Sequence, residues 1–167
     1  QIHFAPKPKE LLRWMLGRGV ESTLRAYGGD PEQGFAAANE GMVALTRWTG
    51  RLKAAMQAAP GHQAWFSSLR RYAHTGPGGV LFVHAGLDPM RPLADQRDAF
   101  WWESGTFPRA AAGYNGFARI VRGHDPDGGG WSEDGITLTI DGGCGQGGPL
   151  IAACLASDGT LLERLEA

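Results

Sequence analysis

The chain has few cysteines, few lysines and no long hydrophobic run. Only Cys144 and Cys154 occur among its 167 residues, and two cysteines are too few for the disulfide framework of a small secreted domain. No apolar stretch approaches the roughly 18 residues that span a bilayer, and no segment has the pattern of a signal peptide. These absences favour a cytoplasmic protein that does not interact with membranes.

An excess of charge of one sign is also lacking. The 16 lysine and arginine residues nearly balance the 17 aspartate and glutamate residues, so the formal net charge is -1. Proteins that bind nucleic acid through bulk electrostatics carry an excess of basic residues, so a nucleic-acid partner is not expected. The length suits one domain with a hydrophobic core, and we expect a single domain over residues 1–167.

Residues 1–75 have the pattern of helices. Pro8 suits the first turn of a helix and Gly17 its end, with leucine and methionine residues at helical spacing between them. The same reasoning predicts helices at residues 21–27, at 31–59 as one helix or two, and at 63–72.

Residues 79–167 have the pattern of a sheet. Apolar or alternating segments predict strands at residues 80–83, 118–121, 136–140, 150–155 and 161–165. The third of these alternates isoleucine and leucine with threonine, which predicts a half-buried strand. Helices followed by strands indicate a layered α+β fold.

Two of the predicted strands lead to a histidine beside glycine. His84 lies in the string Phe-Val-His-Ala-Gly, and His124 ends the string Val-Arg-Gly-His. One such histidine is explained most simply by hydrogen bonds to the backbone. Two at equivalent positions favour a shared ligand, and imidazoles at the edge of a sheet commonly bind metal ions.

A glycine-rich loop follows the strand at 136–140. It runs from Asp141 to Gly148 and contains Cys144. The glycines allow either a close approach of the backbone to a ligand or simply a tight turn, and the loop lacks the spacing and lysine of a P-loop. Cys144 with His124 is an alternative catalytic pair, that of a cysteine hydrolase.

Taken in order, these strings resemble the calcineurin-like metallophosphoesterases, especially the branch of bacterial serine/threonine phosphatases and diadenosine tetraphosphatases. Residues 82–87 resemble the fourth motif of that family, residues 121–124 its Gly-His motif and residues 140–150 its final glycine-rich hairpin. Residues 11–29 and 89–102 resemble further segments. The resemblance therefore covers nearly the whole chain.

The resemblance implies part of a four-layer α/β/β/α sandwich with mainly antiparallel strands. It implies two divalent metal ions (manganese, iron or zinc), of which one is ligated by His84 and His124. A metal-activated hydroxide then hydrolyses a phosphoprotein or a nucleotide-type phosphate. Asp141 and Cys144 lie in the loop that borders the substrate. Relatives often carry an arginine where Ser104 stands, and Arg109 is the candidate replacement.

The first three motifs of the family, which hold its other metal ligands and its catalytic histidine, have no counterpart in residues 1–79. The resemblance therefore implies the C-terminal half of a domain whose partner is a missing N-terminal half, and a chain that is inactive by itself. No catalytic residue beyond the metal ligands is identified. The remaining alternative is a non-catalytic domain of the same fold that binds a partner through Trp101 and Trp102.

Overall fold

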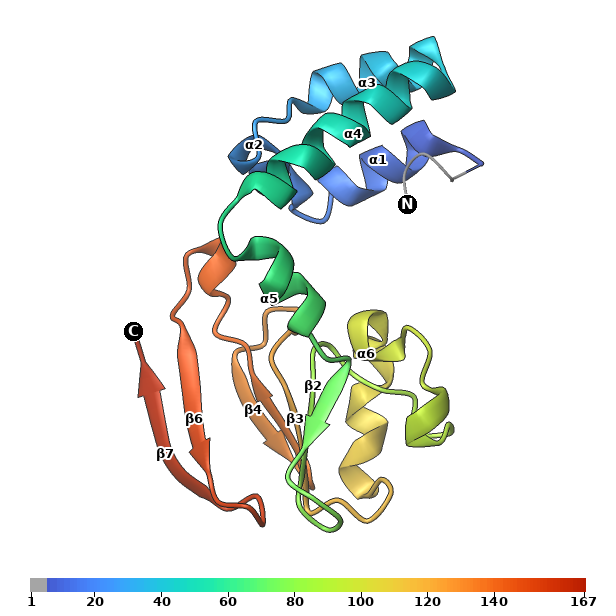
Figure 1. Cartoon of the computed structure of the whole chain (residues 1–167). Helices are drawn as coiled ribbons and strands as arrows, with labels where there is room; N and C mark the ends of the chain where they lie inside the picture. Colours follow the sequence, from blue (N-terminus) through green and yellow to red (C-terminus); the bar gives the residue numbers. More distant parts are fainter. Residues whose placement is uncertain (1–5) are drawn as a thin grey trace. The chain divides into compact units, whose positions relative to one another are not determined.

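The computed structural model describes residues 6–167, which form helices and strands in two compact units. The first unit ends at Leu69 and the second runs from Arg70 to Ala167. The predicted change from helices to strands, at residues 75–79, falls close to this boundary. The mixed α+β class is confirmed (Figure 1). The prediction of one domain over residues 1–167 stays a prediction.

The described part of the first unit, residues 6–69, contains helices and no strand. Its helices are α1 (Pro8–Leu16), α2 (Val20–Ala26), α3 (Pro31–Glu40), α4 (Met42–Ala58) and α5 (His62–Ser68). The long pattern at 31–59 forms two helices, because Gly41 between them has a φ of 128° that residues with a Cβ rarely adopt. Asp30 caps α3 by accepting a hydrogen bond from the Glu32 amide at 3.0 Å.

The helices share a small hydrophobic core. Leu12, Ala37, Leu45 and Trp48 are buried in it, one from α1, one from α3 and two from α4. Gly34 of α3 lies against the Trp48 ring, where a Cβ would meet the ring carbon Cζ2 at 2.7 Å. This close approach allows α3 and α4 to pack tightly, and it explains why glycine stands at a helical position that otherwise favours alanine.

The second unit contains a five-stranded mixed sheet of order β1-β2-β3-β5-β4 and a separate hairpin. Strands β2, β3 and β5 are parallel neighbours at its centre, whereas β1 and β4 pair antiparallel at the two edges. The strands of the sheet are β1 (Tyr72–His74), β2 (Val80–Val83), β3 (Arg119–Arg122), β4 (Trp131–Asp134) and β5 (Thr137–Ile140). The hairpin consists of β6 (Ile151–Leu155) and β7 (Leu161–Glu166).

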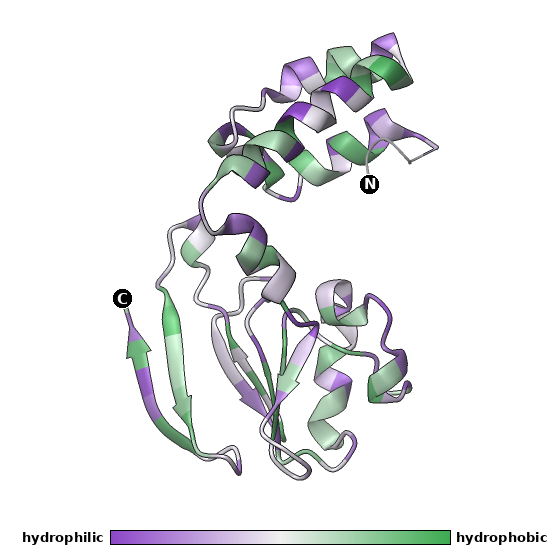
Figure 2. Cartoon of the chain, viewed as in Figure 1, coloured by the Kyte–Doolittle hydropathy of each residue, from purple (hydrophilic) through white to green (hydrophobic). Residues whose placement is uncertain are grey.

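Each face of the sheet has its own apolar cluster. On one face, Leu81 and Ile120 pack with Phe100 of α6 (Ala99–Trp102) and Phe107 of the 3₁₀ helix η3 (Ser104–Ala112). On the other face, Val80, Val121 and Leu138 pack with Leu155 of β6. In Figure 2, β2 carries hydrophobic residues, whereas the edge strand β4 carries hydrophilic ones.

The structure corrects three expectations about the strands. The helix expected at 63–72 ends at Ser68, because Leu69 has extended backbone and Tyr72–His74 pairs with β2 as an edge strand. Strand β4 was not predicted, since its sequence Trp-Ser-Glu-Asp is polar and suits only an edge. The strand at 136–140 was expected to be half-buried, but Thr137, Leu138 and Thr139 are all buried, because β5 lies between β3 and β4 and Leu155 of β6 packs against the cluster that contains Leu138.

The pairing in the sheet is only partly antiparallel. Antiparallel pairs occur at its two edges and in the hairpin, while the three central strands are parallel. No helix in residues 6–167 is both long enough and apolar enough to cross a membrane.

Candidate metal centre

The two predicted histidines lie side by side at one edge of the sheet. His84 directly follows β2, and His124 lies two residues beyond the end of β3. Because β2 and β3 are parallel neighbours, their carboxyl ends meet at the same edge. The amides of Gly123 and His124 donate hydrogen bonds to the His84 carbonyl oxygen at 3.1 and 2.8 Å. The backbone of one loop is thus fixed against the other.

The imidazole rings of this pair are stacked. Their centroids are 5.1 Å apart and their planes differ by 11°. The indole of Trp101 also contacts His84, with ring centroids 5.6 Å apart and planes tilted by 47°. Partial burial lowers the pKa of His84, the nearby His124 lowers it further, and Asp141 opposes both effects. His84 is therefore held as neutral imidazole at pH 7, the form that ligates metal ions.

Asp141 joins the histidines from the third parallel strand. It follows β5, and its carboxylate accepts hydrogen bonds from the amides of Asp125 at 2.8 Å and Gly143 at 2.9 Å. The same Oδ2 lies 3.8 Å from Nδ1 of His124. Burial raises the pKa of Asp141, but the two amide donors together with His124 and Arg122 outweigh this and hold it below its usual value. Asp141 is thus an ionised acceptor that orients the His124 loop.

Arg122, the last residue of β3, is buried, with 6% of its surface exposed. It forms an ion pair with Asp125 at 2.8 Å and donates hydrogen bonds to the Thr139 hydroxyl at 2.8 Å and the Ser104 carbonyl at 3.3 Å. Its guanidinium also lies 4.5 Å from the centroid of the Phe107 ring. Burial lowers the pKa of this guanidinium, and Asp125 with two further aspartates opposes that effect.

Sequence reasoning missed this arginine. It assigned the candidate phosphate contact to Arg109, which is exposed on η3 and forms no hydrogen bond or ion pair with another described residue. The signal for Arg122 was present, because a charged residue ends a buried strand and an aspartate follows three positions later. A buried charge needs a partner, and Asp125 at i+3 supplies one.

Cys144 lies in the loop after Asp141, on the short 3₁₀ helix η4 (Cys144–Gln146), and its thiol is exposed. No described residue forms a hydrogen bond with this thiol. A cysteine hydrolase requires a base within hydrogen-bond reach of the nucleophile. The geometry within the described residues therefore does not favour the Cys144–His124 pair.

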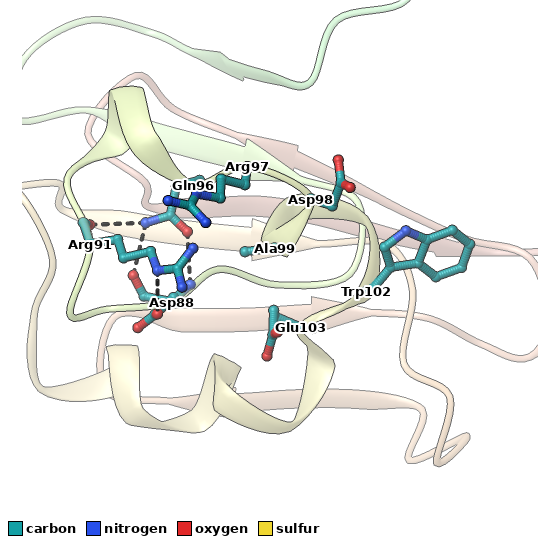
Figure 3. A pocket seen from close by; sticks show the side chains of 8 residues that line it. All are labelled: Asp88, Arg91, Gln96, Arg97, Asp98, Ala99, Trp102 and Glu103. Carbon is teal, nitrogen blue, oxygen red and sulfur yellow. Dashed lines mark hydrogen bonds and ion pairs between the residues drawn. The ribbon is translucent and has the colours of Figure 1, made fainter.

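The second unit contains a pocket of about 280 Å³ (Figure 3). The loop after β2 and the end of α6 form its walls. They approach each other at Gly86, where a Cβ would overlap the carbonyl oxygen of Glu103, so only glycine fits. The residues that line the pocket are Asp88, Arg91, Gln96, Arg97, Asp98, Ala99, Trp102 and Glu103.

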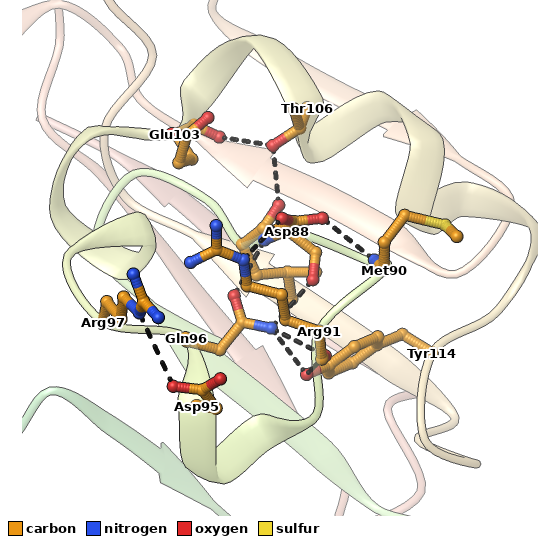
Figure 4. Close-up of polar contacts among 10 residues, drawn as sticks. Asp88, Met90, Arg91, Asp95, Gln96, Arg97, Glu103, Thr106 and Tyr114 are labelled. Carbon is orange, nitrogen blue, oxygen red and sulfur yellow. Dashed lines mark hydrogen bonds and ion pairs between the residues drawn. The ribbon is translucent and has the colours of Figure 1, made fainter.

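Gln96 holds the floor of this pocket in place (Figure 4). It is 1% exposed, and its amide oxygen accepts a hydrogen bond from the Asp88 amide at 2.8 Å. Its amide nitrogen donates to the carbonyl oxygens of Asp88 and Arg91 and to the Tyr114 hydroxyl, at 2.8 to 2.9 Å. Because the side chain is fully bonded to two loop positions, the loop after β2 has a defined shape.

No group of three or more histidine, cysteine, aspartate or glutamate side chains in residues 6–167 is arranged to hold a metal ion. What the described residues bring together here is a pair of imidazoles and a carboxylate that orients the His124 loop. Compared with known protein families, curated proteins and solved structures, the chain matches none.

Proposed function

We propose that this chain contributes part of a dinuclear metal centre that hydrolyses phosphoesters, as in the calcineurin-like metallophosphoesterases that its motifs resemble. The observation that supports this proposal is the meeting of His84, His124 and Asp141 at the carboxyl ends of three neighbouring parallel strands. These three residues come from the separate motifs on which the resemblance rests. A mixed sheet with helices on one face and β6 on the other suits part of the proposed four-layer sandwich.

The donor set fits part of such a centre. Imidazole nitrogen is a ligand that manganese, iron and zinc all accept. The rings of His84 and His124 lie side by side but are stacked, so a shared ion requires one ring to rotate until a nitrogen of each imidazole points at it. A site of two divalent ions needs more ligands than these, and the proposal assigns the others to the upstream motifs of the family, which residues 1–79 do not contain. This chain without those motifs is expected to be inactive.

Two divalent ions, when bound, would activate water and neutralise the charge on phosphate. The residues of this chain bind and orient. His84 and His124 supply nitrogen ligands, and Asp141 fixes the loop that carries His124 through its bond to the Asp125 amide. Trp101 contacts the His84 ring, with the ring centroids 5.6 Å apart. Phosphoprotein and nucleotide-type phosphates are the substrate classes that this chemistry serves.

The proposal is tested by hydrolysis of p-nitrophenyl phosphate in the presence of manganese. The assay requires a polypeptide that joins this chain to the upstream motifs. His84→Ala and His124→Ala should each lower kcat/KM at least 100-fold, since each removes a metal ligand. His74→Ala is the matched control, because His74 lies on an edge strand and stacks with Tyr72. Near-normal activity in both ligand variants would overturn the proposal.

A further inference from the structure

The guanidinium of Arg122 joins three separate segments of the second unit. Its Nε donates a hydrogen bond to the Thr139 hydroxyl of β5 at 2.8 Å, and Nη1 donates to the Ser104 carbonyl of η3 at 3.3 Å. Its Nη2 lies 2.8 Å from Oδ2 of Asp125, in the loop after β3. Each nitrogen of this buried guanidinium therefore has a partner, and each partner comes from a different segment.

The ion pair between Arg122 and Asp125 encloses one of the two histidines. These residues are three positions apart, so only Gly123 and His124 lie between them. A glycine allows the backbone many conformations when nothing else restricts it. Because the residues on both sides are held together, the ion pair limits the conformations that are open to Gly123 and His124. It thus acts on the backbone that carries an imidazole.

Asp125 connects this ion pair to the edge of the sheet. Its amide donates to the Asp141 carboxylate at 2.8 Å, so Asp125 is held both by its side chain and by its backbone. Just before it in the chain, the amides of Gly123 and His124 donate to the His84 carbonyl oxygen. The backbone of His124 is therefore fixed between β2 on one side and Asp125 on the other.

The side chain of His124 is held less firmly than its backbone. It is 44% exposed, it stacks on the His84 ring at a centroid distance of 5.1 Å, and its Nδ1 lies 3.8 Å from Asp141. Contacts of this kind are weak when one side of the ring faces water. The place of the His124 ring beside His84 therefore depends on the backbone from which it extends.

We infer that Arg122 is a positioning residue for the histidine pair: through Asp125 it fixes the backbone of His124 so that the two imidazoles meet. The inference deepens the proposed function and rests on it for its chemical purpose, because an ion shared by two imidazoles requires both rings to be in place. Arg122 acts through other residues, since its guanidinium is buried and its nitrogens are bonded to protein groups.

The test separates this role from the contribution of Arg122 to stability. Three variants of the chain are compared with wild type: Arg122→Met, the double variant Arg122→Met with Asp125→Asn, and Arg119→Met as the control on the same strand. The double variant leaves no buried charge without a partner, so much of the lost stability should return. It still lacks the link from Arg122 to the His124 loop. Each variant is measured where its β5 amide signals show that the sheet is folded.

The first readout needs no metal. NOEs between the ring protons of His84 and His124 report the stacked pair, and hydrogen exchange of the His124 amide reports its bond to the His84 carbonyl oxygen. We expect both Arg122 variants to lose the ring NOEs. The His124 amide should also exchange about tenfold faster in them, relative to the amides of β5. Arg119→Met should keep the NOEs and the protection of wild type.

The second readout is zinc affinity, measured by isothermal titration calorimetry. Loss of a residue that orients a metal ligand weakens binding about 10- to 100-fold, so both Arg122 variants should bind zinc about tenfold more weakly than wild type or worse. A residue that served stability alone would allow the double variant to recover its zinc affinity together with its stability.

Two results would overturn the inference. One is a double variant that keeps the ring NOEs and the protection of the His124 amide. The other is an unaltered zinc affinity in the double variant when wild type binds zinc. A wild-type chain that binds no zinc would count against the proposed function instead, and the metal-free readout would still decide whether Arg122 positions the histidines.

Discussion

The buried ion pair of Arg122 and Asp125 provides a quantitative prediction about stability. Arg122→Met replaces a guanidinium that is 6% exposed with an apolar side chain of similar length. It leaves the Asp125 carboxylate without its cation, and the side chain of Asp125 is only 9% exposed. Removing one partner of a buried pair costs about 3–5 kcal/mol, because the remaining charge stays away from water without compensation.

The same strand contains a matched control. Arg119 of β3 pairs with Glu133 at 2.9 Å, and the exposed fractions of these side chains are 19% and 42%. Exposed pairs contribute about 0.2–1 kcal/mol, so Arg119→Met should destabilise the sheet far less than Arg122→Met. The double variant Arg122→Met with Asp125→Asn removes both charges and should recover a large part of the loss.

Urea unfolding, followed through the amide NMR signals of β3 and β5, measures these free energies for the sheet itself. This readout is chosen because the chain has two compact units and one global signal would combine them. The reasoning would be refuted if Arg122→Met cost no more than Arg119→Met, or if the double variant were no more stable than the single one.

Two further changes test the geometry of the site. Asp141→Asn should destabilise the sheet by about 1.5–3 kcal/mol at pH 7, because a carboxylate accepting two amide hydrogen bonds is lost. Since the folded pKa of Asp141 is depressed, its contribution is present above the ordinary aspartate pKa and is lost as the pH falls through the folded value. The urea stabilities of wild type and variant should therefore converge in acid, and a constant difference down to about pH 2 would contradict this. Gly86→Ala should cost about 1–3 kcal/mol in thermal unfolding through overlap with the Glu103 carbonyl, whereas Gly105→Ala, whose Cβ meets nothing within 4 Å, should be nearly neutral.

The elements that the sequence predicted well are those with a strong local signal. Helix α1 runs from Pro8 to Leu16, as the proline, the leucine spacing and Gly17 indicated. Strand β2 matches the apolar run at 80–83. Strand β1 was missed because its three residues are stabilised by pairing with β2 and not by a pattern of their own. Such long-range pairing leaves no periodic trace in a sequence.

In the candidate site, too, the features with a local sequence signal were predicted and those that depend on the fold were not. The placement of His84 and His124 after hydrophobic runs allowed the pair to be predicted, because parallel strands bring their carboxyl ends together. The phosphate contact of Arg109 stays a prediction, and Arg122 was not named, since residue type alone does not reveal burial. Arg122 is recognisable only when its partners on β5 and η3, Thr139 and Ser104, are known.

The most direct test of the account is zinc binding by this chain, measured by isothermal titration calorimetry and by the ring-nitrogen NMR shifts of its histidines. The account predicts that zinc shifts His84 and His124 together, and that His84→Ala weakens binding at least tenfold. His74→Ala, which removes a histidine elsewhere on the sheet, should bind zinc as wild type does. Equal loss in both variants, or zinc shifts that leave His84 and His124 unchanged, would contradict the claim that these two residues form a metal site.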